Sequence, residues 1–229
     1  MDPEPGRFGP TDTPPRAPTG REQIFNAPLL AVLVAVSMPA LFFFQARSSD
    51  SWIGLAFVPT ELAQGRWTGL FTSMLVHGDW VHALVNAVAA LTFGTPVARL
   101  LKGSGGVGAF IVLYSVSGAV GALGYALIHL GSSQPMGGAS GAVFGLIGAA
   151  TRLLGGGGRV LPLTDRRVVT TSIAWMGVNA VIGLIGFAPG AEGAQIAWEA
   201  HAFGFLAGLL LIGPLGRWFG ETQAPLARI

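Results

Sequence analysis

Six long apolar stretches follow one another along this chain, and they limit its fold more than any other feature. A helix needs about 20 apolar residues to cross the roughly 30 Å of hydrocarbon in a bilayer. Because only 10% of the residues are charged and the mean hydropathy is +0.60, the chain is unlike a water-soluble domain. We therefore predict an all-α membrane protein, a polytopic bundle of six transmembrane helices. The stretches lie at 25–46, 80–98, 106–130, 139–154, 168–188 and 195–216.

The bundle is expected to occupy residues 22–218, with a tail on either side. Residues 1–21 are rich in Pro, Gly and Thr, and such a segment buries too little apolar surface to fold. They are predicted to form a disordered cytoplasmic tail, and residues 219–229 a short second one. No small-residue cleavage site closes a short apolar core in the first stretch, so we expect this stretch to be a helix of the protein and not a cleaved signal peptide.

The distribution of basic residues predicts the orientation in the membrane. Of the 13 Lys and Arg residues, all except Arg47 and Arg66 lie in the two tails and in alternate connections. Because basic connections tend to stay in the cytoplasm, both termini are predicted to be cytoplasmic. The net charge of +2 then reflects topology and gives no indication of nucleic-acid binding. Our hypothesis for the location is the bacterial inner (plasma) membrane.

The connection between the first and second stretches is the longest on the predicted outer side. Residues 47–79 include several aromatic side chains and few charges, a composition typical of segments that lie in the membrane interface. We therefore expect this connection to be part of the structure and not a simple tether.

A few polar side chains lie within the apolar stretches, where burial is costly and function is the usual reason for their presence. His82, Ser140 and His201 occur near the starts of the second, fourth and sixth stretches, which run in the same direction in the predicted topology. These three side chains are therefore expected at the same outer depth. Asn179, in the fifth stretch, is predicted to make an interhelical hydrogen bond.

These positions suit nucleophilic catalysis by a serine. A serine hydroxyl attacks a carbonyl when a base removes its proton, and histidine is the usual base. His201 is the better candidate, because glycines on both helices allow the fourth and sixth stretches to approach closely. Neither Asp79 nor Glu199 is placed to complete a triad, so we predict a Ser140–His201 dyad. The glycines are Gly141, Gly145, Gly204 and Gly208.

Donors for a developing oxyanion are available nearby. His82 and Asn86 are spaced i, i+4 and share one helical face, from which both side chains can donate to the negative oxygen of a tetrahedral intermediate. The backbone N–H of Ser140, at a helix start, can add a third hydrogen bond. Gly138 allows the chain to bend and approach a substrate closely, and Gly141 keeps the neighbouring helix near.

Three motifs in this order resemble those of the rhomboid intramembrane serine proteases, in their bacterial six-helix form. They are HGDWVHALVN at 77–86, GASG at 138–141 and AHAFGFLAG at 200–208, and the resemblance covers about residues 60–212. It implies that Ser140 is the nucleophile, that His201 is the general base, and that His82, Asn86 and the Ser140 amide form the oxyanion hole.

The resemblance also implies what the protein acts on. Its substrates would be membrane proteins, cleaved near the outer end of a transmembrane helix where small or helix-breaking residues allow unwinding. Its other partner would be the lipid bilayer, and no metal or cofactor is expected. Two positions depart from the family pattern: Trp67-Thr68 stands where many members have a Trp-Arg pair, with Arg66 on the other side of the tryptophan, and Phe144 stands where a tyrosine often packs beside the base. A phenyl ring can also stack on imidazole.

Two alternatives belong to other functional classes. One is a zinc-dependent membrane hydrolase with His77, His82 and His201 as ligands, although the chain lacks the HExxH pattern and a nearby carboxylate base. The other is a catalytically silent rhomboid-like protein that binds or escorts membrane helices. Such proteins typically lose the serine or the base, whereas this chain has both.

Overall fold

The computed structural model describes residues 27–48, 52–186 and 197–220. The predicted tail 1–21 and residues 221–229 of the second predicted tail lie outside these ranges. Within the described ranges the chain is helical. The elements are α1 (Leu29–Gln45), η1 (Trp52–Leu55), α2 (Pro59–Leu62), α3 (Gly69–Thr72), η2 (Ser73–Leu75), α4 (Trp80–Leu100), α5 (Gly103–Ile128), α6 (Ser140–Thr151), α7 (Arg166–Ile185) and α8 (Trp198–Phe219).

The predicted all-α membrane fold is confirmed, and each of the six apolar stretches overlaps one of the helices α1, α4, α5, α6, α7 and α8. Helices α4, α5, α7 and α8 are long and apolar enough to cross a membrane, whereas α1 and α6 are apolar but shorter. The 12 residues of α6 extend only about 18 Å at 1.5 Å per residue. This is less than the thickness of the hydrocarbon layer, so α6 is too short to cross a full layer by itself.

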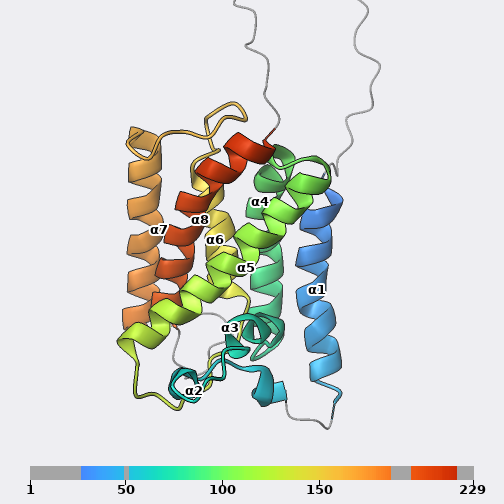
Figure 1. Cartoon of the computed structure of the whole chain (residues 1–229), viewed down its shortest axis with the longest axis vertical. Helices are drawn as coiled ribbons and strands as arrows, with labels where there is room; N and C mark the ends of the chain where they lie inside the picture. The colour runs from blue at the N-terminus through green and yellow to red at the C-terminus, as the bar shows by residue number, and fades with distance from the viewer. Residues whose placement is uncertain (1–26, 49–51, 187–196, 221–229) are drawn as a thin grey trace, which may run out of the picture.

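Helix α6 is the centre of the bundle and packs against α4, α5 and α8 (Figure 1). Ten of its twelve residues are buried. The closest packing is with α8, because a Cβ atom on Gly204 would collide with the carbonyl oxygen of Gly141, and one on Gly208 with that of Gly145. The prediction that these glycines bring the two backbones together is therefore confirmed.

Helices α4, α6 and α8 all begin at the same end of the bundle, which is also the end that carries α2 and α3 (Figure 1). Each of these three helices starts within a few residues of a polar side chain singled out in the sequence: His82, Ser140 and His201 lie in their first turns. The parallel direction of the three helices thus brings a hydroxyl and two imidazoles to one level.

The connection between α1 and α4 packs against the segment that leads into α6. Phe57 is buried and exchanges two backbone hydrogen bonds of 2.8 Å with Met136, and the Gly138 N–H donates to the carbonyl of Ser73 at 2.9 Å. Trp67 exposes 56% of its surface, as expected of a side chain that contacts the lipid interface. The connection therefore braces the backbone immediately before Ser140.

Helix α7 lies at the edge of the bundle, on the opposite side from α1 (Figure 1). Its start is capped by Asp165, whose carboxylate accepts a hydrogen bond from the Arg167 N–H at 2.9 Å. Within α7, all of which the structure describes, Val168 and Asn179 are the buried residues. The helix thus has few side chains that fix it to the bundle, and Asn179 is one of them.

Candidate active site

Ser140 and His201 are in contact across the α6–α8 interface. Ser140 is the first residue of α6, and His201 lies in the first turn of α8. The Ser140 Oγ is 2.8 Å from Nε2 of His201, and both residues are half-buried. This distance is within the reach required of a nucleophile and its base. The short separation depends on the glycine contacts between α6 and α8 described above.

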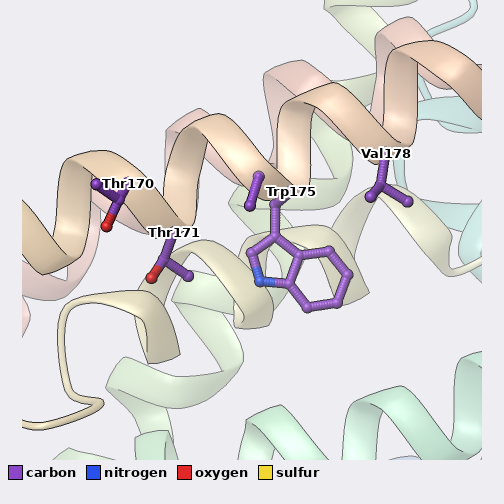
Figure 2. Close-up of a pocket in the computed structure, with 5 residues that line it drawn as sticks. Thr170, Thr171, Trp175 and Val178 are labelled. Carbon is purple, nitrogen blue, oxygen red and sulfur yellow. The ribbon is translucent and has the colours of Figure 1, made fainter.

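The ring of His201 is also covered by an aromatic face. Phe144, one turn after Ser140 on α6, stacks on His201 with ring centroids 4.3 Å apart and an interplanar angle of 3°. Phe144 also makes an edge-to-face contact with Trp175, and Trp175 makes another with Phe93. Trp175 projects from α7, as Figure 2 shows, and lines a groove beside this helix. That groove is lined by Thr170, Thr171, Ala174, Trp175 and Val178.

His82 lies beside the segment that precedes Ser140. Asp79 caps α4 by accepting a hydrogen bond from the His82 N–H at 2.8 Å, which fixes His82 in the first turn. A Cβ atom on Gly138 would lie 2.7 Å from Cε1 and 2.9 Å from Nε2 of His82, and 3.7 Å from Ser140 Oγ. Because it has no Cβ atom, Gly138 leaves free the space between the His82 ring and the serine hydroxyl.

Asn86 lies one turn after His82 on α4 and is 5% exposed. Its amide nitrogen has no hydrogen-bond partner in the part of the chain that the structure describes. Buried donors are nearly always paired in folded proteins. The unpaired Asn86 amide lies beside the candidate site, so it is a donor available to a ligand.

His77 is completely buried, and its ring meets the edge of the His82 ring with centroids 5.4 Å apart. Burial lowers the pKa of His77 to about 4, and the neighbouring His82 lowers it in the same direction, so the imidazole is neutral at pH 7. Among the described residues, no three His, Asp or Glu side chains are grouped closely enough to hold a metal ion. This arrangement does not favour the zinc hypothesis.

A comparison with known protein families matches the rhomboid domain to residues 64–218 of this chain. This match covers most of the bundle and includes Ser140 and His201. The chain belongs to the rhomboid family. Among curated proteins it is 28% identical over 188 residues to rhomboid protease GluP of Bacillus subtilis (strain 168), an alignment that covers 79% of this chain and 34% of GluP.

A second relative of this rhomboid is YdcA of the same strain, whose name also assigns it to the rhomboid proteases. It is 27% identical over 156 residues, which cover 66% of this chain and 68% of YdcA. The present chain therefore spans about a third of the length of GluP and about two thirds of that of YdcA.

Two polar contacts around the site of this rhomboid were not predicted from the sequence. Asn179 makes the expected interhelical hydrogen bond, but its Oδ1 is also 3.0 Å from Nδ1 of His201. Glu199, in the first turn of α8, pairs with His129 at the end of α5 at 3.0 Å. The sequence does contain a pattern that points to packing at Asn179. Trp175, Asn179 and Gly183 are spaced four residues apart and so share one face of α7.

Proposed function

We propose that this protein is a serine endopeptidase that hydrolyses a peptide bond in or near transmembrane segments of membrane proteins. The observation that carries the proposal is the 2.8 Å contact between Ser140 Oγ and His201 Nε2 at the start of α6. Family membership and the names of GluP and YdcA support the same activity. A hydroxyl paired with an imidazole is the minimal apparatus of a serine protease.

The reaction begins when His201 Nε2 takes the proton of the Ser140 hydroxyl and Oγ attacks the carbonyl carbon of the scissile bond. The carbonyl oxygen becomes an oxyanion, which accepts hydrogen bonds from the His82 and Asn86 side chains and from the Ser140 N–H. His201 then gives its proton to the leaving amine as the C–N bond breaks. Attack of water on the acyl-enzyme, by the same route in reverse, regenerates Ser140.

The position of the site suits a substrate embedded in the bilayer. Because α6 is about 18 Å long, Ser140 lies below the membrane surface when the basic end of α6 is at the opposite interface. With the termini in the cytoplasm, the site opens toward the outer side of the membrane. A transmembrane helix that unwinds near its outer end would present an extended peptide bond at this depth.

The proposal is tested with a serine-directed fluorophosphonate probe on the purified protein in detergent. The wild type is expected to form one covalent adduct, located at Ser140 by peptide mass spectrometry, and Ser140→Ala is expected to form none. His201→Ala should react roughly 10²- to 10⁴-fold more slowly, because the hydroxyl has lost its base.

Ser37→Ala is the matched control, because Ser37 is exposed on α1 and, among the described residues, its hydroxyl bonds only the Val34 carbonyl of its own helix. It should be labelled like the wild type. An unlabelled wild type that also binds single-span peptides without cutting them would overturn the proposal and support the silent, helix-binding alternative.

The oxyanion hole leads to a separate prediction at Gly138. Gly138→Ala is expected to reduce cleavage of a single-span reporter by about 10²-fold, the effect of losing one oxyanion donor. The backbone at Gly138 has φ +139°, which L side chains rarely adopt, and the added Cβ would push the His82 ring away from the serine. The measurement is the initial cleavage rate, with far-UV circular dichroism to confirm the helical fold.

The neighbouring variant Gly137→Ala is the control for this prediction. Gly137 does not have a positive φ, and a Cβ there would meet the Val76 side chain at 3.3 Å, which can shift slightly. It should retain activity within a few-fold of the wild type. Equal losses in Gly137→Ala and Gly138→Ala would mean that the segment as a whole is fragile and that His82 placement is not the cause.

A further inference from the structure

The imidazole of His201 is held on three sides by three different side chains. Ser140 meets Nε2 at 2.8 Å, Asn179 meets Nδ1 at 3.0 Å, and Phe144 covers one ring face. Ser140 and Phe144 come from α6, whereas Asn179 comes from the peripheral helix α7. The role of Asn179 in this arrangement goes beyond an interhelical hydrogen bond.

Asn179, His201 and Ser140 form a row of hydrogen bonds, and one backbone carbonyl determines which group donates and which accepts in each of them. The carbonyl of Trp198 can only accept, and the Asn179 amide donates to it through Nδ2 at 2.8 Å. That contact fixes the amide orientation, so the atom facing His201 is Oδ1, which can only accept. His201 must therefore donate from Nδ1–H.

A neutral imidazole that carries its proton on Nδ1 has a lone pair on Nε2. This lone pair faces the Ser140 hydroxyl, which then donates its proton toward Nε2. The opposite tautomer would direct an N–H at the serine and could not accept its proton.

We propose that Asn179 is a positioning residue that fixes the Nδ1–H tautomer and the ring orientation of His201, so that Nε2 is always ready to accept the Ser140 proton. This inference rests on the proposed function and adds a third member to its catalytic pair. Asn179 is 3% exposed, so water cannot readily replace its hydrogen bond to Nδ1. The residue acts through His201 and does not touch the reacting bond.

The surrounding contacts hold Asn179 in place. Trp175, Asn179 and Gly183 are spaced four residues apart and lie on one face of α7. The rings of Trp175 and Phe144 are in edge-to-face contact, and Gly183 leaves space for the Trp198 side chain, which a Cβ atom would strike. The contacts on either side of Asn179 therefore fix the height of α7 relative to α8, and with it the distance from Oδ1 to Nδ1.

The amide suits this position electrostatically. An aspartate would place a full charge in a region of low dielectric, at a high desolvation cost, whereas an amide oxygen orients the ring while remaining neutral. The imidazolium that forms after proton transfer lies against the face of Phe144, and an aromatic face attracts a cation. Orientation and charge stabilisation thus come from different side chains.

Asn179→Leu tests the inference, because leucine has a similar size and cannot accept a hydrogen bond. With a single-span reporter in detergent, kcat is expected to fall by roughly 10²-fold, while KM changes less than about threefold, because Asn179 does not contact substrate. Ser172→Ala is the control on the same helix: the Ser172 hydroxyl has no partner among the described residues, so its removal should leave kcat unchanged. A kcat of Asn179→Leu within about twofold of the wild type would overturn the inference.

A second measurement reads the tautomer directly and does not require activity. The chain has four histidines, so ¹⁵N NMR of histidine-labelled protein, purified without a polyhistidine tag, gives few signals, and that of His201 is assigned by its absence in His201→Gln. The wild type is expected to show Nδ1 protonated and Nε2 unprotonated, and Asn179→Leu a mixture of both tautomers. A wild-type His201 protonated on Nε2 would overturn the inference, even if Asn179→Leu fails to fold.

Failure of this inference is distinguishable from failure of the proposed function. If wild type cleaves the reporter and Ser140→Ala does not, while Asn179→Leu behaves like wild type, the protease assignment stands and the role of Asn179 is wrong. If the wild type neither cleaves nor reacts with the fluorophosphonate probe, the protease assignment is wrong, and the tautomer still reports whether Asn179 orients His201.

Discussion

Ser140→Ala and His201→Ala are each expected to lower the turnover of a single-span reporter by a factor of at least about 10⁴. In the proposed mechanism the Ser140 oxygen forms the bond to the substrate carbonyl, and alanine has no atom that can replace it. His201 is the only described imidazole in hydrogen-bond contact with Ser140, so no neighbouring base can take over. The measurement is single-turnover cleavage in detergent with enzyme in excess, followed by mass spectrometry of the products.

The double variant Ser140→Ala/His201→Ala sharpens this prediction. Because the two side chains act in one proton transfer, removing both should cost little more than removing either one. Losses that multiply would show that the two side chains act independently and would contradict the dyad. Thermal unfolding of each variant serves as a control, since neither substitution removes a large buried apolar side chain.

The membrane fold could be predicted from the sequence because the bilayer imposes a simple physical requirement. A spanning segment must satisfy its backbone hydrogen bonds internally and be long and apolar enough to cross the hydrocarbon, and both conditions leave a clear trace in the sequence. Successive helices cross the membrane in alternating directions, so α4, α6 and α8 were expected to run in the same direction. This expectation placed His82, Ser140 and His201 at one level without knowledge of any contact.

The contacts of α7 could not be predicted in the same way. Hydropathy gives the existence and length of a helix but not its rotation or its height relative to a neighbour, and α7 has polar and small residues on several faces. The hydrogen bond between Asn179 and His201 depends on a carbonyl at the start of α8, at Trp198. A backbone carbonyl is present at every residue, so the sequence does not indicate which one accepts a hydrogen bond from Asn179. The contact with Trp198, and with it the orientation of the Asn179 amide, could be seen only once the helices were placed.

The outer connection shows a similar limit. Its aromatic content predicted an interfacial segment, but no periodicity indicated that Phe57 pairs with Met136 or that Ser73 accepts a hydrogen bond from Gly138. These contacts are between loop backbones, whose geometry depends on the positions of α4 and α6. The same connection carries Arg66, whose guanidinium pairs with Glu61 at 3.0 Å, a contact that the sequence pattern did not indicate either.

Gly208→Val is expected to destabilise the protein by about 3 kcal/mol or more, at or beyond the upper end of the range for overpacked cores. A Cβ atom at this position would strike the carbonyl of Gly145, and a helix backbone cannot move aside as a flexible side chain can. Helix α8 must therefore shift away from α6, which separates His201 from Ser140. Since a displacement of about 1 Å can cost roughly 10²-fold in rate, cleavage should be lost together with stability.

Gly177→Val is the matched control, because Gly177 is on α7 and, beyond the neighbouring backbone of that helix, no described atom lies within 4 Å of the position of a Cβ. The same substitution there should change the free energy of unfolding by no more than about 1 kcal/mol, the scale of helix propensity. Unfolding in increasing sodium dodecyl sulfate, followed by tryptophan fluorescence, measures both variants against the wild type. If Gly208→Val unfolds at the wild-type midpoint and still cleaves, the backbone contact between α6 and α8 is not what holds the serine and the histidine together.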